Sequence, residues 1–260
     1  MSAPRCYDGA PPPDARRGRD ASMCSNYIPV SRRDRLLTFF GVARERDEEP
    51  VDTWPLGLAP FIRLAEDGSG FERIVDDGIF GLLPDFATEL AFGRRTYNAR
   101  SETVGRLPSF RESWSRGWRC VIPCEAIYEP NWETGECVRW AIHQEGFVPF
   151  GVAGIYRPWR HPDGRELLSF AMLTVNADDH PLMKRFHRPG DEKRMVVILD
   201  PEDYGNWLTC RVQDASAYLR QWDKPLAAVP SPLPPRAPKA SSVRTVRPPR
   251  PPAPETGSLF

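Results

Sequence analysis

The chain has 260 residues, of which 27% are charged, and a formal net charge of zero. A neutral chain has no global positive field, so any nucleic-acid partner requires a local groove of basic side chains. No apolar run approaches the roughly 20 residues of a membrane-spanning helix, so no membrane partner is expected. Six cysteines could form three disulfides, but nothing else indicates secretion, so we expect reduced thiols in a cytoplasmic protein.

Composition divides the chain into three regions. Residues 1–22 contain no apolar core, so we expect a disordered leader or a segment upstream of a start at Met23. Residues 23–222 have the composition of one globular domain. From residue 223 to residue 260 the chain is rich in Pro, Ala and Arg, which predicts a flexible tail with little to bury.

The globular region combines several apolar strands with few helices. Ser31 to Asp34 resembles a capping box in front of a helix that reaches Phe40. A short helix is expected over 110–116, and another begins at Asp200-Pro201. Strands are predicted at 119–128, 148–156, 167–175 and 195–199. This pattern predicts an α+β fold, a single domain on a strongly bent, mostly antiparallel sheet or partial barrel with a few flanking helices.

A start at Met23, followed by removal of the methionine, would make Cys24 the N-terminal residue. Its α-amine and thiol would then lie on adjacent carbons. Such a pair condenses with an aldehyde to a Schiff base and closes to a five-membered thiazolidine. An internal cysteine cannot do this, because its nitrogen is a resonance-stabilised amide. The chain that begins at Met1 is therefore expected to form no thiazolidine.

Four separated points indicate one site: Cys24, the hexapeptide N-A-R-S-E-T at 98–103, Glu129 and His187. Together with supporting segments they resemble the SOS response-associated peptidase (SRAP) family, whose members shield abasic sites in single-stranded DNA. The supporting segments are W-x-x-G-x-R-C at 114–120, L-A-P at 58–60, F-G-L-L-P at 80–84 and R-M-V-V-I-L at 194–199. The resemblance covers about Met23 to Trp207.

The resemblance implies a role for each point of the site. Cys24 would be the nucleophile toward the ring-opened aldehyde of an abasic deoxyribose, and Glu129 the general acid/base. Asn98 would orient the α-amine or the sugar, and His187 would polarise the sugar oxygen or bind a phosphate. A β-elimination (lyase) side reaction through the Schiff base is expected. The implied protein is a nucleoid-associated monomer that needs no cofactor and no metal.

DNA contacts are expected from Phe86, which would stack on a base, and from arginines near the motifs. These arginines are Arg94, Arg95, Arg100, Arg116 and Arg188, of which Arg100 would hold a phosphate bidentately.

The chain also departs from the family pattern. Ser25-Asn26 replaces the Gly-Arg that usually follows the cysteine, which removes one phosphate contact. Asp85 precedes Phe86 and is expected to repel phosphates. The stretch between His187 and Arg194 is longer than usual, which leaves His180 as a second candidate histidine.

Other interpretations stay open. Cys24 with His187 as base and Asn98 as orienting group would make a cysteine peptidase that removes its own leader. A non-catalytic module that binds single-stranded DNA is a third hypothesis. The motif residues also have structural readings, in which Arg100 pairs with Glu102 and His187 is a solvated loop residue.

The globular region also contains closely spaced cysteines and tryptophans. Cys120 and Cys124, with Cys137 and His143 nearby, have no second closely spaced pair and lie in an apolar strand, so we expect no metal. The pairs Trp114/Trp118 and Trp132/Trp140 are expected in the core.

Overall fold

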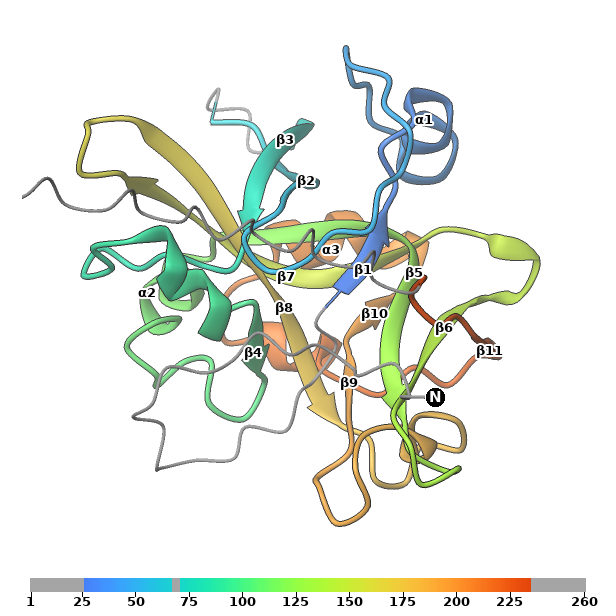
Figure 1. Ribbon diagram of the computed structural model, residues 1–260. Helices are drawn as coiled ribbons and strands as arrows, with labels where there is room; N and C mark the ends of the chain where they lie inside the picture. The colour runs from blue at the N-terminus through green and yellow to red at the C-terminus, as the bar shows by residue number, and fades with distance from the viewer. Residues whose placement is uncertain (1–25, 67–70, 235–260) are drawn as a thin grey trace, which may run out of the picture.

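A closed ring of five strands forms the centre of the molecule (Figure 1). The computed structural model describes residues 26–66 and 71–234. The ring order is β7, β8, β3, β2 and β5, and β5 pairs back with β7. All neighbours are antiparallel except β3 and β8, which are parallel. The ring strands are β2 (Leu58–Leu64), β3 (Arg73–Phe80), β5 (Arg119–Asn131), β7 (Phe150–Arg160) and β8 (Glu166–Asn176).

Glycine at position 154 lets the ring close. Gly154 of β7 lies opposite Cys120 of β5. A Cβ atom on Gly154 would lie 2.6 Å from the side chain of Ile122 and 2.8 Å from the Sγ atom of Cys120. Because carbon atoms do not pack at such distances, a larger residue here would push β5 and β7 apart.

The second half of β5 leaves the ring and becomes the centre of a smaller sheet. β1 (Asn26–Pro29) pairs with one side of it and β6 (Val138–Gln144) with the other. At Tyr128 the partners are Asn26 on β1 and Ala141 on β6. β11 (Leu226–Pro230) extends this sheet by pairing with β6. The strand pairing therefore continues past residue 222, where the sequence predicted the beginning of a flexible tail.

Three short strands complete the sheet. β4 (Asn98–Arg100) runs parallel to β8, β9 (Arg194–Val196) runs antiparallel to β8, and β10 (Ile198–Leu199) pairs with β7. All four strands predicted from apolar runs are confirmed. The last of them, 195–199, is divided between β9 and β10.

The helices are short. The α-helices are α1 (Arg33–Phe40), α2 (Arg111–Ser115) and α3 (Tyr204–Thr209). The 3₁₀ helices are η1 (Leu90–Arg95), η2 (Glu145–Phe147), η3 (Met183–Arg185), η4 (Pro201–Asp203) and η5 (Ala215–Tyr218). The expected capping box at α1 is wrong, because the hydroxyl of Ser31 donates to the carbonyl oxygen of Glu48, 2.9 Å away, and the residue that caps α1 is Arg32.

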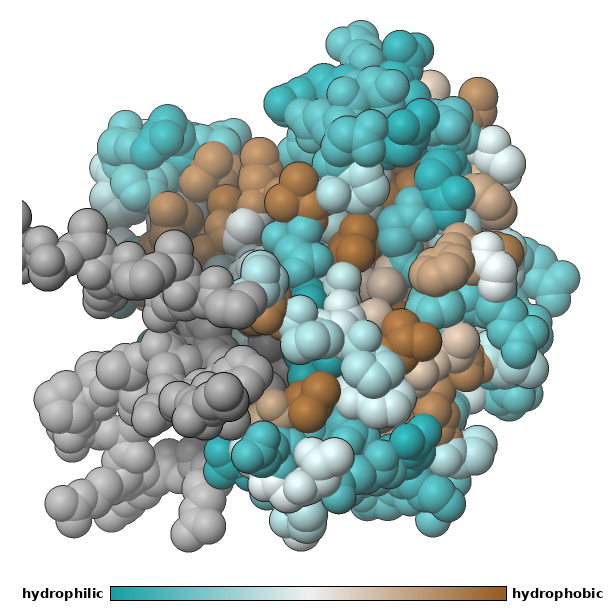
Figure 2. All heavy atoms as spheres, turned by 45° about the vertical axis from the view of Figure 1, so that its right-hand side comes forward, coloured by the Kyte–Doolittle hydropathy of each residue, from teal (hydrophilic) through white to brown (hydrophobic). Residues whose placement is uncertain are grey.

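The barrel interior is filled by aromatic and branched side chains. The Phe170 ring lies 5.4 Å from the Phe61 ring and 5.6 Å from the Phe80 ring, and all three residues are fully buried. On the face drawn in Figure 2, apolar side chains emerge in separate patches between polar ones.

No helix within the described residues is long and apolar enough to cross a membrane. The protein is thus an α+β single domain, and its sheet closes into a complete barrel.

Candidate active site

Glu129 and His187 form a buried acid–imidazole pair. The Oε2 atom of Glu129 lies 3.0 Å from the Nε2 atom of His187, and each side chain is 1% exposed. A buried carboxylate is costly unless it is hydrogen-bonded and paired. The structure therefore brings together two of the residues that the sequence singled out, although they are 58 positions apart.

Both residues are held by the smaller sheet. Glu129 lies near the end of β5, where it pairs with Trp140 of β6. The backbone N–H of His187 donates to the carbonyl oxygen of Pro130 at 2.8 Å. His187 has a φ of 63°, in the left-handed region that glycine favours. A non-glycine residue pays about 1 kcal/mol or more for this conformation, so the surrounding structure holds the imidazole in place.

The pair favours a protonated imidazole. Burial acts to lower the pKa of His187, but the charge and hydrogen bond of Glu129 outweigh it, and the pKa is raised above 6.5. The other ring nitrogen, Nδ1, accepts a hydrogen bond from the backbone N–H of Arg194 at 3.4 Å, a long contact that only the neutral imidazole makes and that protonation would break. Both ring nitrogens of His187 therefore have partners, and its hypothesised role as a solvated loop histidine is wrong.

This arrangement predicts a pH-dependent stability. The pKa of His187 is higher in the folded protein than in the unfolded chain, where it is about 6.5. His187 therefore makes its full contribution to the free energy of unfolding below about pH 6.5. This contribution is lost as the pH rises through the folded value. We expect His187→Gln to lower the melting temperature more at about pH 6 than at about pH 9, with each unit of pKa shift contributing about 1.4 kcal/mol. His161→Gln, which alters a surface turn, is the control. An equal loss at both pH values would contradict the pair.

The motif N-A-R-S-E-T is joined to His187 through Arg194. The guanidinium of Arg194 donates to both carboxylate oxygens of Glu102, at 2.9 and 3.0 Å, and to the carbonyl oxygen of Thr174 at 2.8 Å. Burial acts to raise the pKa of Glu102, but the hydrogen bonds and charge of Arg194 lower it. The backbone nitrogen of Arg194 in turn faces the imidazole. Arg194 therefore connects the motif to the buried pair.

The structural interpretation of the motif, in which Arg100 and Glu102 pair with each other, is wrong. Arg100 is bound by Glu192 at 2.7 Å, and Glu102 is bound by Arg194. Sequence reasoning included Glu102 and Arg194 only as members of motif segments, and it missed Glu192 and the ion pairs that join these three residues to the site. The available signal was an arginine at the start of a buried apolar strand, where a charge needs acidic partners.

Asn98 lies buried on β4, where it pairs with Met172 of β8. Arg100 lies opposite Thr174 on one side of β8, and Val196 of β9 lies opposite Thr174 on the other. β8 thus carries the motif on one edge and the strand after His187 on the other.

The arginines expected to bind DNA differ in their surroundings. Arg116 is bound by Glu112 at 2.9 Å, as Arg100 is by Glu192. Arg94 and Arg95 are exposed at the end of η1, and the guanidinium of Arg95 lies 5.1 Å from the centre of the Phe92 ring. Arg188 is exposed beside His187. Paired arginines must exchange a carboxylate for a phosphate, so Arg100 and Arg116 are the weaker candidates.

Phe86 and Asp85 lie in the loop between β3 and η1. Phe86 is 55% exposed, and its ring meets the Phe92 ring edge-on at 5.5 Å. Asp85 is bound by the buried guanidinium of Arg157. Arg157 therefore offsets part of the negative charge of Asp85, although it also binds Glu112 at 2.9 Å.

His180 is a structural residue. Its Nδ1 atom accepts hydrogen bonds from the backbone N–H groups of Leu182 and Met183, at 3.1 and 3.0 Å. Its Nε2 atom faces the carbonyl oxygen of Trp222 at 2.8 Å. His180 is therefore wrong as an alternative to His187.

The thiols of Cys120 and Cys124 are fully buried, and burial raises their pKa well above the usual range. Among the residues that the structure describes, no group of three or more His, Cys, Asp or Glu side chains is placed to hold a metal ion.

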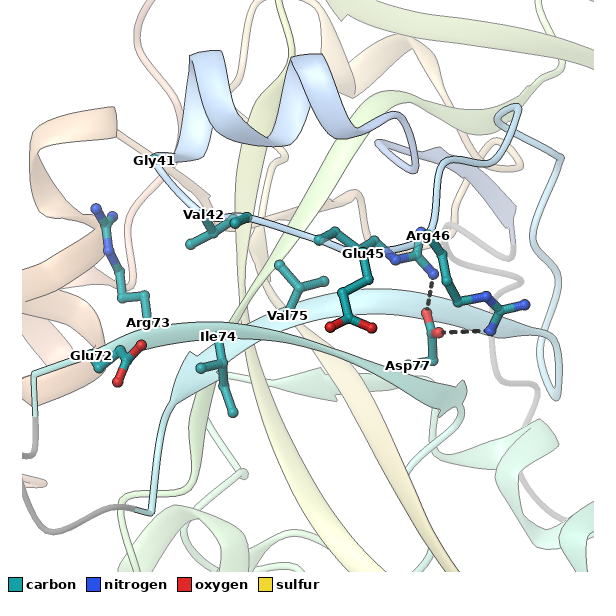
Figure 3. A pocket seen from close by; sticks show the side chains of 11 residues that line it. Gly41, Val42, Glu45, Arg46, Glu72, Arg73, Ile74, Val75 and Asp77 are labelled. Carbon is teal, nitrogen blue, oxygen red and sulfur yellow. Dashed lines mark hydrogen bonds and ion pairs between the residues drawn. The ribbon is translucent and has the colours of Figure 1, made fainter.

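A hollow of about 680 Å³ lies away from the buried pair, between the segment after α1 and β3 (Figure 3). Three of the charged side chains that line it pair with one another, since Arg44 and Arg46 both contact Asp77. It contributes no residue to the site described above.

A family model described as SOS response associated peptidase (SRAP) matches residues 23–231. The chain belongs to the SRAP family. This match includes the buried pair, the motif and β11, and it begins at Met23. Cys24 itself lies outside the described residues, two positions before the first residue of β1.

Similar proteins cover most of the SRAP region. The abasic site processing protein YoqW of Bacillus subtilis (strain 168) is 31% identical over 210 residues, which cover 79% of this chain and 88% of that protein. The abasic site processing protein HMCES of Rattus norvegicus is 25% identical over 198 residues, which cover 62% of this chain and 52% of that protein. A solved structure from Bordetella bronchiseptica has a TM-score of 0.74 and 36% identity, and covers 81% of this chain and 100% of that one.

Proposed function

We propose that this SRAP protein processes abasic sites in DNA, and that it does so by covalent capture in single strands through Cys24 at its N-terminus. Residues 1–23 would be removed before the protein acts. The observation that carries this proposal is the buried Glu129–His187 pair beside the start of β1. The relatives' names support the abasic site as the substrate, and the family match from residue 23 supports the N-terminus.

Strand register places the start of β1 beside the buried pair. Asn26 lies opposite Tyr128, the residue before Glu129. Two residues of extended chain span at most about 7 Å, so the covalent chain limits how far Cys24 can lie from Asn26. β1 is also held by Arg139, whose Nε atom donates to the side chain of Asn26 at 3.4 Å. This tether supports Cys24 as the group that meets the aldehyde.

The proposed reaction has a simple atom balance. The α-amine of Cys24 adds to C1′ of the ring-opened deoxyribose, and loss of one water leaves a Schiff base. The thiol then adds to the C=N bond, and its proton passes to the nitrogen, which closes the thiazolidine. An α-amine has a pKa of about 7.7 to 8.0, so a useful fraction is neutral near pH 7.

Glu129 would shuttle protons in these steps. Its carboxyl group would protonate the departing oxygen and accept the proton of the thiol, which is general acid–base catalysis. His187 holds one oxygen of this carboxyl group at 3.0 Å, so its orientation is fixed. Asn98 would orient the amine or the sugar. The same proton transfers in reverse would open the thiazolidine.

The geometry disfavours a cysteine peptidase. A peptidase would need an imidazole nitrogen directed at the thiol. In this protein Nε2 of His187 faces Glu129, and Nδ1 faces the backbone of Arg194. Nε2 of His187 is therefore already hydrogen-bonded to Glu129 and is not directed at a thiol.

A denaturing gel tests the proposed function. The chain that begins at Cys24 is incubated with a single-stranded oligonucleotide containing one abasic site, or with the same oligonucleotide undamaged. We expect a slower-migrating adduct only with the abasic oligonucleotide and without added reductant. Hydrolysis of unrelated peptides in the absence of any adduct would favour the peptidase instead.

DNA binding by a neutral protein predicts a limited salt dependence. Each phosphate that the protein contacts on a single strand lowers the log–log slope of affinity against salt by about 0.7. We expect Arg188→Ala and Arg95→Ala each to reduce the slope by about one such contact, because neither arginine forms an ion pair with a described residue. Fluorescence anisotropy at several salt concentrations measures this, and a slope near zero in the unsubstituted protein would contradict a basic groove.

A further inference from the structure

We propose that Trp132 and Arg188 form a stacking surface for a nucleobase next to the abasic site. This inference rests on the proposed capture function. The guanidinium carbon of Arg188 lies 4.7 Å from the centre of the Trp132 ring, well inside the roughly 6 Å range of a cation–π contact. Trp132 follows β5 three residues after Glu129, and Arg188 follows His187 directly. Each residue of the stack therefore lies within three positions of one member of the buried pair in the sequence.

Trp132 does not act as a core residue, which corrects the sequence expectation. Trp114, Trp118 and Trp140 pack against the hydrophobic core, whereas Trp132 is not among the residues that do so. Its indole Nε1 is buried without a hydrogen-bond acceptor among the described residues. A buried indole normally pairs its N–H group. An unpaired indole N–H is costly, and the ring contact that the described residues give Trp132 is with Arg188.

A second arginine–indole stack, Arg185 with Trp140, differs from the first because its arginine is ion-paired. Arg185 lies 5.3 Å from the centre of the Trp140 ring, but both carboxylate oxygens of Glu133 bind its guanidinium at 2.9 Å. Arg188 is exposed and forms no ion pair within the part of the chain that the structure describes. Of the two stacks, Trp132–Arg188 keeps its positive charge available for a ligand.

The loop that carries Arg188 is folded back on His187. The backbone carbonyl of Arg188 accepts hydrogen bonds from the Lys193 ammonium at 2.8 Å and from the backbone N–H of Asp191 at 3.1 Å. The same ammonium also donates to the carbonyl oxygen of His187, 3.3 Å away. The lengthened stretch between His187 and Arg194 therefore presents Arg188 in a fixed position.

This chemistry fits a nucleobase. The Arg188 guanidinium lies against the indole, and an exposed guanidinium stacks readily on the face of a base. Its N–H groups would still reach a phosphate of the same nucleotide. Because stacking grows with ring area, a purine beside the abasic site should bind better than a pyrimidine, and both better than a nucleotide without a base.

Affinity for a non-reactive DNA tests the surface. The probes are single-stranded oligonucleotides with one tetrahydrofuran nucleotide, which has no aldehyde, flanked on both sides by adenine or by further tetrahydrofuran nucleotides. Stacking of one base is worth about 1–3 kcal/mol, so we expect at least roughly fivefold tighter binding of the adenine-flanked probe. Trp132→Ala and Arg188→Ala should remove this preference, Trp132→Phe should keep part of it, and Arg185→Ala, the matched control, should leave it intact.

Two outcomes would overturn the inference: equal binding of both probes by the unsubstituted protein, or an equal loss of preference in Arg185→Ala. Adduct formation with reactive abasic oligonucleotides is measured in parallel. Adducts that form without any dependence on flanking bases would refute the stack and leave the capture function standing. A base preference without any adduct would refute the capture function and leave the stack standing.

Discussion

A chain that begins at Cys24 is expected to become linked to abasic single-stranded DNA, whereas the chain that retains residues 1–23 is expected to form no adduct. The reason is the nitrogen of Cys24, which is a nucleophilic amine in the first chain and a resonance-stabilised amide in the second. The measurement is the fraction of oligonucleotide that migrates with the protein on a denaturing gel. An adduct on the intact longer chain would contradict the proposed role of the α-amine.

Two variants of the shorter chain separate the amine from the thiol. Cys24→Ser keeps the amine and loses the thiol, so the Schiff base forms but does not close to a thiazolidine. We expect this variant to lose the stable adduct and to cleave more DNA by β-elimination. Acetylation of the amine in the unsubstituted chain should abolish both the adduct and the cleavage. A thiol-based peptidase would tolerate that acetylation.

The second large effect is expected for Glu129→Gln. Glutamine keeps the shape of the side chain and can still accept a hydrogen bond from His187, but it cannot carry a proton. Loss of a general acid/base slows a reaction by about 10²- to 10⁴-fold. We expect adduct formation and adduct reversal to slow together, because both use the same proton transfers. Single-turnover rates measure this, with adduct formation started from the free protein and adduct reversal started from the adduct.

Glu133→Gln is the matched control for that variant. Glu133 lies four residues from Glu129, but it is exposed and binds Arg185 at the surface. It should capture DNA at the rate of the unsubstituted protein. If Glu129→Gln folds, binds DNA and reacts as fast as Glu133→Gln, then Glu129 is not the proton shuttle.

Local apolar patterning predicted three of the five ring strands, β5, β7 and β8, but not β2 and β3. The run from Arg119 is buried almost throughout as β5, and the strand predicted over 167–175 lies within β8 (Glu166–Asn176). Closure of the barrel was not predictable in the same way. It depends on which strands pair across the ring, and the glycine at 154 reveals its role only once Ile122 and Cys120 are seen beside it.

The site, too, was predictable from the sequence only in part. Sequence reasoning named Glu129 and His187, and the structure places them in contact. It could not find that Arg194 binds Glu102, because the two residues are 92 positions apart and meet only across β8. It also could not find that Arg157 binds Asp85, since the ion pairs of a loop residue depend on neighbours that the fold supplies.

Intact mass tests the central claim most directly. The protein is weighed under denaturing conditions before and after incubation with a single-stranded oligonucleotide that carries one abasic site, with no reductant present. The account predicts a starting mass that corresponds to Cys24 as the first residue, and a product equal to protein plus oligonucleotide minus one water. A chain that begins at Cys24 and gains no mass, or an adduct on a chain whose α-amine is blocked, would contradict it.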